Sequence, residues 1–122
     1  MAMQRQTDFI RTTLSLAAGT SGVFDLGPYD RINGAAGVLE VRLTTPAASA
    51  GTQLLTARVG NRVQTSGYAV AGEEYAGAGP NARTQPIMVQ GGRGDVIRME
   101  LTNPTGGTVV TTLQGTLQQI GR

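Results

Sequence analysis

The chain has 122 residues, a length typical of one domain. It contains no Cys, His, Trp or Lys, which excludes disulfides, Ser-His triads, cysteine-ligated zinc and lysine chemistry. The formal net charge is only +2, and the ten arginines are spread along the chain, whereas nucleic-acid binders cluster them. We therefore expect no enzymatic activity, no cofactor or metal, and no nucleic-acid partner. The sequence also has no apolar run long enough to cross a membrane.

Taken in chain order, residues 1–7 show no hydrophobic pattern, and we expect them to form an extended N-terminal arm. From there to the C-terminus, about eight segments alternate apolar and polar residues with the period of two that is typical of strands. The predicted strands are residues 10–16, 23–26, 38–44, 53–59, 62–70, 86–90, 95–102 and 108–120.

Two connections are informative. Gly60-Asn61 separates two predicted strands and is suited to a two-residue hairpin turn. Residues 71–85 hold four Ala, three Gly and one Pro without periodicity, which indicates a long surface loop. No segment keeps a helical period for three turns, so the strands have no crossover helices and must pair mainly antiparallel.

These features predict an all-β fold in which residues 8–122 form a single domain. About eight antiparallel strands fit either a two-sheet sandwich of jelly-roll type or a closed barrel. We favour the sandwich, because the predicted strands differ in length and one loop is long.

The predicted last strand is long and carries no charge from Thr108 to Ile120. Unpaired strand edges attract a second chain unless charge, Pro or a bulge blocks them. The sequence therefore suggests that an edge or face of this strand is covered by another subunit, and we expect a homo-oligomer.

Three features together resemble the capsid decoration (cement) proteins and other small structural proteins of tailed double-stranded DNA bacteriophages. They are the polar arm ahead of Phe9-Ile10-Arg11, the segment 94–103 (GDVIRMELTN), and the Thr-rich last strand. The resemblance covers most of the chain and lies in its composition and predicted strands, not in a diagnostic motif.

The resemblance implies a non-enzymatic protein on the virion's capsid surface, with the major capsid protein as partner and a trimer as the favoured oligomer. It brings no catalytic residues. Arm contacts would map onto Met3, Gln4, Arg5, Gln6, Thr7, Asp8 and Phe9.

Two other functions remain open at this point. A carbohydrate- or receptor-binding sandwich would use an aromatic platform with nearby carboxylates, and Tyr68, Glu73, Glu74 and Tyr75 offer these groups around the long loop. A capsid-forming coat protein in contact with nucleic acid would use the arginines, although few aromatic residues lie beside them.

Overall fold

The computed structural model describes residues 5–121, which form two mainly antiparallel sheets. The elements are β1 (Arg5–Leu16), β2 (Ser21–Val23), the 3-10 helix η1 (Gly27–Tyr29), β3 (Ala36–Thr45), the 3-10 helix η2 (Ala47–Ser49), β4 (Leu54–Val59), β5 (Arg62–Ala69), β6 (Ala71–Gly72), β7 (Ile87–Gly92), β8 (Ile97–Thr102) and β9 (Val109–Ile120). The described chain contains no α-helix. The predicted all-β class is confirmed, and the two-residue β6 is an additional strand that the pattern does not predict.

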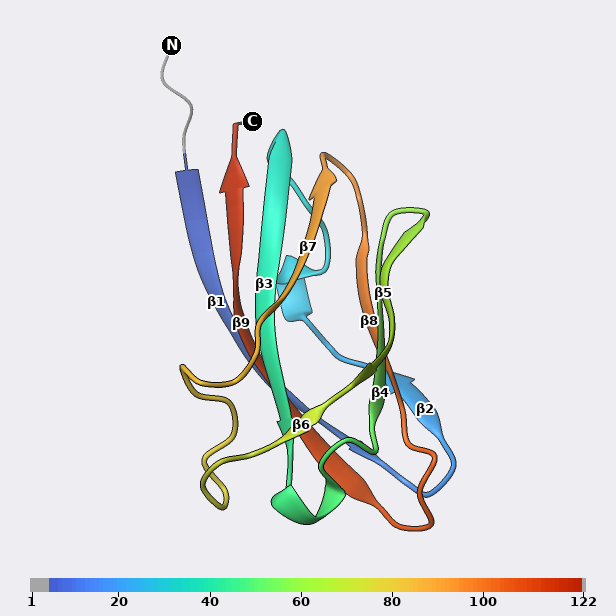
Figure 1. The fold of residues 1–122 in the computed structure, drawn as a ribbon. Coiled ribbons are helices and arrows are strands. Elements are labelled where there is room, and N and C mark those ends of the chain that lie inside the picture. The colour runs from blue at the N-terminus through green and yellow to red at the C-terminus, as the bar shows by residue number, and fades with distance from the viewer. Residues whose placement is uncertain (1–4, 122) are drawn as a thin grey trace.

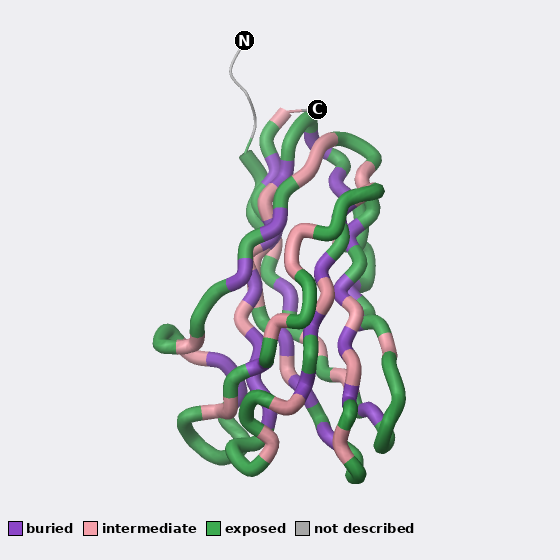
Figure 2. The backbone as a smooth tube through the Cα atoms, turned by 45° about the vertical axis from the view of Figure 1, so that its right-hand side comes forward, coloured by how far each residue is buried: buried purple, intermediate pink, exposed green. Residues whose placement is uncertain are grey.

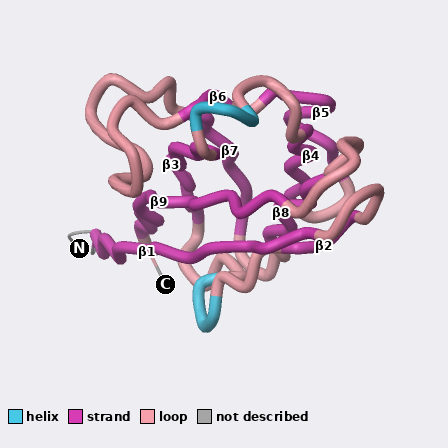
Figure 3. The backbone as a smooth tube through the Cα atoms, turned by 90° about the horizontal axis from the view of Figure 1, so that it is seen from below, coloured by secondary structure: helices cyan, strands magenta, loops and turns pink. Residues whose placement is uncertain are grey.

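The two sheets lie face to face, as Figure 1 and Figure 3 show. Sheet A has the order β1-β9-β3-β6 with β7 also beside β3, and sheet B has the order β2-β8-β4-β5. The strands form nested antiparallel pairs: β1 with β9, β2 with β8, β3 with β7 and β4 with β5. Successive pairs alternate between the sheets, which is the winding of a jelly roll. The sandwich prediction is therefore confirmed.

The core lies between the sheets and consists of the residues that the alternation predicts to point inward. Leu39, Val41 and Leu43 of β3 are buried, as are Met99 and Leu101 of β8. Figure 2 shows buried and exposed positions alternating along the strands. Each buried aliphatic side chain contributes about 1.5–3 kcal/mol, so this layer is what holds the two sheets together.

The two-residue hairpin turn is also confirmed. Val59 pairs with Arg62 across Gly60 and Asn61. Gly60 has a φ of 59°, and no non-glycine residue in the described chain has a positive φ. Positive φ at the first central residue alone is the requirement of a type II′ turn, which only glycine meets without strain.

The expectation that another subunit covers an edge of β9 is wrong, whereas a contact at its outer face stays a prediction. β9 pairs with β1 on one side and with β3 on the other, so both edges are hydrogen-bonded within the chain. Its Gly115 lies so close to β3 that a Cβ atom would overlap the carbonyl oxygen of Glu40. β9 is therefore an interior strand of sheet A.

Asn103 is a buried polar residue that ties the end of β1 to the connection before β9. Its side-chain amide donates to the carbonyl oxygens of Leu16 (3.0 Å), Ala17 (3.2 Å) and Gly107 (2.8 Å). Its side-chain oxygen accepts from Gln53 Nε2 (2.9 Å) and from the backbone N–H of Thr105 (3.0 Å). These bonds satisfy the buried amide of Asn103 itself and link the end of β1 to the turn before β9.

No helix in the described part of the chain is long and apolar enough to cross a membrane.

Candidate assembly surface

Most residues predicted to contact a partner lie in a strand. Arg5, Gln6 and Thr7 belong to β1 and pair with β9 from Ile120 backwards, as do Asp8 and Phe9. The portion of the expected arm that the structure describes is therefore the start of the edge strand of sheet A. Met3 and Gln4 lie outside the described residues.

β1 differs from the other outer strands in how its free edge is protected. It runs for 12 residues, all of them paired to β9 without a register shift, and no described strand pairs with its other side. By contrast, β2 has three residues, and β5 has two register shifts in its pairing with β4. Short or bulged edge strands resist pairing with another chain. β1 has neither of these protections and no proline, and only the charges of Arg5, Asp8 and Arg11 oppose a partner strand. The other regular outer strand, β7, is half as long, and the Gln64 side chain bonds both backbone groups of its Gln90. β1 therefore presents the longest regular free edge among the described strands.

Phe9 lies in the middle of β1 on the outer face of sheet A, the face that points away from the core. Its side chain is 81% exposed. It begins a row that crosses the sheet through Thr116 of β9 and Glu40 of β3 to Met88 of β7, which is 59% exposed. Phe9 and Met88 thus leave apolar surface exposed at the two ends of this row.

The loop after β6, residues 73–86, covers another part of this outer face. Gly79 and Pro80 are buried, and a Cβ on Gly79 would lie 3.2 Å from a guanidinium nitrogen of Arg11 and 3.5 Å from Thr112 Cγ2. Arg42 Nε also donates to the carbonyl oxygen of Thr84 at 2.9 Å. The loop therefore folds back on its own sheet, and the row that begins at Phe9 remains uncovered.

The carboxylates predicted for a sugar site are engaged inside this loop. Glu73 accepts hydrogen bonds from the backbone N–H groups of Gly77 (2.9 Å) and Gly79 (3.4 Å). Glu74 forms an ion pair with Arg83 at 2.7 Å and accepts from Asn81 Nδ2 at 3.0 Å.

The two tyrosines of the predicted sugar site have different surroundings. Tyr68 of β5 is half-buried and packs against the core, whereas Tyr75 is 63% exposed. The carboxylate contacts hold the loop in shape, and of the four predicted residues Tyr75 offers the most free surface.

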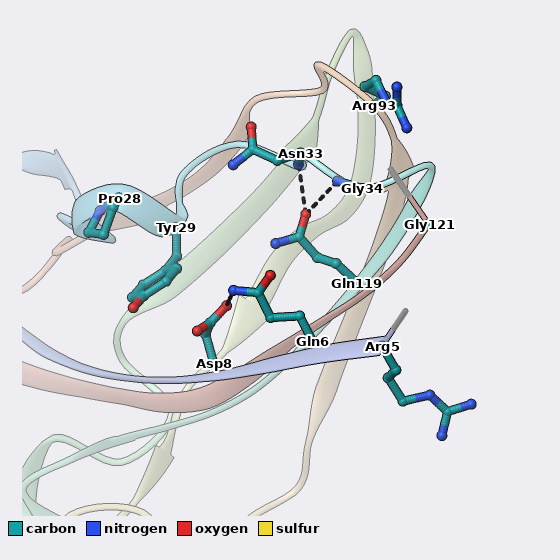
Figure 4. A pocket seen from close by; sticks show the side chains of 10 residues that line it. All are labelled: Arg5, Gln6, Asp8, Pro28, Tyr29, Asn33, Gly34, Arg93, Gln119 and Gly121. Carbon is teal, nitrogen blue, oxygen red and sulfur yellow. Dashed lines mark hydrogen bonds between the residues drawn. The ribbon is translucent and has the colours of Figure 1, made fainter. Parts of the chain in front are cut away.

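A hollow lies at the end of the sandwich where β1 begins (Figure 4). Its volume is about 890 Å³, and its walls come from the start of β1, the segment around η1, the end of β9 and the turn at Arg93. Gln119 Oε1 accepts from the backbone N–H groups of Asn33 (2.7 Å) and Gly34 (2.9 Å), which fixes one wall. Asp8 accepts from Gln6 at 3.1 Å, and the ring of Tyr29 stands beside them. The hollow thus combines an aromatic ring with carboxylate and amide groups, a composition suited to a polar ligand.

The outer face of sheet B carries a pair of like charges. Arg58 of β4 lies directly opposite Arg98 of β8, and Thr56 and Glu100 complete a shallow hollow of about 390 Å³. Arg98 forms an ion pair with Glu100 at 3.3 Å, in which both side chains are about half exposed. Like charges opposite each other on neighbouring strands are destabilising. The sequence gives no signal for this pair, because forty residues separate the two arginines and only the strand order brings them together.

No group of three or more metal-ligating side chains is brought together anywhere in residues 5–121.

The comparisons with known proteins support the fold. No family model matches the chain, and no curated protein matches its sequence. Two solved structures share its fold, each with a TM-score of 0.51 and 15% sequence identity. One is the PRD1 vertex protein P5, with 88% of this chain and 95% of that chain covered. The other is a chain of the acidic stable capsid structure of Helicobacter pylori bacteriophage KHP30, with 98% and 96% covered.

Proposed function

We propose that this protein is a non-enzymatic structural component of a bacteriophage virion that binds the outer capsid lattice and stabilises it as a decoration protein. The observation that carries the proposal is the jelly-roll fold, which nearly the whole chain shares with a vertex protein and with a chain of a capsid structure. The open edge of β1 and the exposed Phe9 support it, since they supply a surface for contacts between subunits.

The mechanism is mechanical. A rigid sandwich that spans the seam between capsid subunits buries surface on both sides, and the shell can then separate only when these contacts break. Specific protein contacts bury about 1,200–2,000 Å² in total, of which the most buried apolar side chains contribute most.

The test uses particles of the phage that encodes the chain, purified on a density gradient and treated with nuclease. We expect the protein to co-purify with the shell at a fixed copy ratio, measured by quantitative mass spectrometry. Particles made without it should still assemble and should release their genome at a lower temperature. Recovery of the protein only from the soluble fraction would contradict a virion role. Failure of particles to form without it would contradict decoration and indicate a shell-forming protein.

The hollow in Figure 4 favours one second candidate, a carbohydrate-binding module. Jelly rolls also occur in lectins, and Tyr29 with Asp8 and Asn33 provides the ring and polar groups that sugars need. A glycan array tests it with two variants. Specific binding lost in Tyr29→Ala would place the ligand in the hollow, whereas loss in Tyr75→Ala would place it on the loop after β6. An array without specific binding would dismiss this function.

A further inference from the structure

The unpaired side of β1 presents backbone groups that can bind a strand. In an antiparallel sheet, alternate residues of a strand direct their N–H and C=O groups to each side, so the 12-residue β1 offers half of these groups away from β9. The continuous register with β9 keeps them in a regular row. Such a row is a template for one more strand.

We propose that this edge pairs with β1 of a second copy, antiparallel and about a two-fold axis, so that two copies of sheet A become one continuous sheet. The inference rests on the proposed function and deepens it, because it adds a contact between copies of the chain to the contact with the capsid. It is an isologous contact, in which each copy uses the same strand, and it gives a dimer in place of the trimer that the resemblance implies.

Face and charge together limit the register of this pair. The outer face stays outward only if odd-numbered residues oppose odd-numbered residues and even oppose even, since side chains alternate along a strand. A register centred on Asp8 would oppose Asp8 to its own copy and Arg5 to Arg11, which are like charges. A register centred on Phe9 opposes Phe9 to its own copy, Thr7 to Arg11 and Arg5 to Thr13, and no like charges face each other.

The register centred on Phe9 also gives the exposed ring a partner. Aromatic pairs opposite each other on antiparallel strands are stabilising. The ring is 81% exposed in the single chain and would be shared between the two copies.

There is also room on the inner side of the edge for a second strand. A shallow hollow of about 250 Å³ runs beside β1 and is lined by Ile10 together with Leu26 and Tyr29 from the segment around η1. Even-numbered side chains of a second β1 would lie over this hollow. Sheet pairing and side-chain contact therefore act at the same edge.

The chain offers a matched control in Met88. Like Phe9 it is an exposed apolar residue on the outer face of sheet A, but it lies on β7 at the far end of the same row. The same substitution at Met88 also replaces an exposed apolar side chain, but it leaves β1 unchanged.

The first test is sedimentation equilibrium of the purified chain over a range of concentrations. We expect a reversible dimer for the natural protein. Phe9→Lys should raise the dimer dissociation constant at least tenfold, because the substitution occurs twice in a two-fold contact. Met88→Lys should change this constant by less than twofold. Circular dichroism should show both variants folded, since neither side chain is buried. The proposal would be overturned if the natural protein is monomeric or trimeric, or if Phe9→Lys leaves the dimer dissociation constant unchanged.

The second test uses the absence of cysteine from the chain. Directly opposed residues on antiparallel strands are close enough for a disulfide. Under mild oxidation, Phe9→Cys should form a covalent dimer rapidly, and Met88→Cys should not exceed the rate of random collision. Equal rates would refute pairing at β1. This outcome is separate from the proposed function, because the protein could still be found in purified particles.

Discussion

β1 and β9 lie side by side and have the same length of 12 residues, yet they have opposite roles. β9 is paired on both sides and buries Leu113 and Leu117 in the core. β1 is paired on one side, carries Arg5, Asp8 and Arg11, and exposes its largest apolar side chain. The comparison teaches that lack of charge does not mark an edge open to a partner: the uncharged β9 is paired on both sides, whereas β1, with three charged residues, has a free edge.

The largest effect is expected from a substitution at the close contact between β9 and β3. Gly115→Val should unfold the protein or cost more than about 4 kcal/mol, since the new Cβ overlaps the Glu40 carbonyl and has no room to relax. Urea unfolding followed by circular dichroism measures the change. The control Thr116→Val, one residue along and pointing outward, should change stability by less than about 0.5 kcal/mol. Equal stability of both variants would contradict the close packing of β9.

A second pair of variants compares the two strands directly. Leu117→Ala in β9 removes a fully buried side chain and should lower the free energy of unfolding by about 2–5 kcal/mol. Phe9→Ala in β1 removes a larger side chain, yet it should cost less than about 0.5 kcal/mol when measured at a concentration where the protein is monomeric. A large loss for Phe9→Ala in the monomer would mean that the ring belongs to the core.

The third test concerns the hydrogen bonds of Asn103, which link the end of β1 to the turn before β9. Asn103→Ala should cost about 2–3 kcal/mol, because the Leu16 and Gly107 carbonyls and the Gln53 amide lose a buried partner. Gln118→Ala, an exposed position on β9, serves as the control and should be near neutral. The same denaturation experiment measures both variants, and equal losses would show that the Asn103 network does not hold the ends together.

The smallest expected effect concerns a surface contact between the strands. Arg11 Nη1 donates to Gln114 Oε1 at 2.5 Å on the outer face. Arg11→Ala should reduce stability by no more than about 1 kcal/mol, since an exposed contact gains little over hydration. Thermal unfolding of the monomer detects such a change as a shift of a few degrees. A larger loss would indicate that the loop over Arg11 depends on this side chain.

The sequence predicted those parts of the fold that depend on neighbouring residues. The alternation of β3 and β8 and the turn at Gly60 are local patterns, and the structure confirms them. The start of β1 escaped prediction because Arg5, Gln6 and Thr7 are all exposed at the end of an edge strand, so no apolar alternation marks them.

The candidate site was less predictable, because it depends on strand order. The uncharged β9 suggested an intersubunit contact, whereas only the pairing of β9 with both β1 and β3 shows that its neighbours are in the same chain. The opposition of Arg58 and Arg98 depends on the same long-range order. Of the described residues predicted to contact a partner, Phe9 is the large apolar one, and the structure leaves its side chain exposed; its contact stays a prediction.

Hydrogen–deuterium exchange at two protein concentrations tests the central claim most directly. Amides of β9 should be protected at both concentrations, because their partners lie within the chain. The backbone amides of β1 between Arg5 and Thr13 that point away from β9 should exchange rapidly when the protein is dilute. They should become protected when it is concentrated. If these β1 amides exchange at the same rate at both concentrations, the edge has no partner strand in a second copy, and assembly through β1 is contradicted.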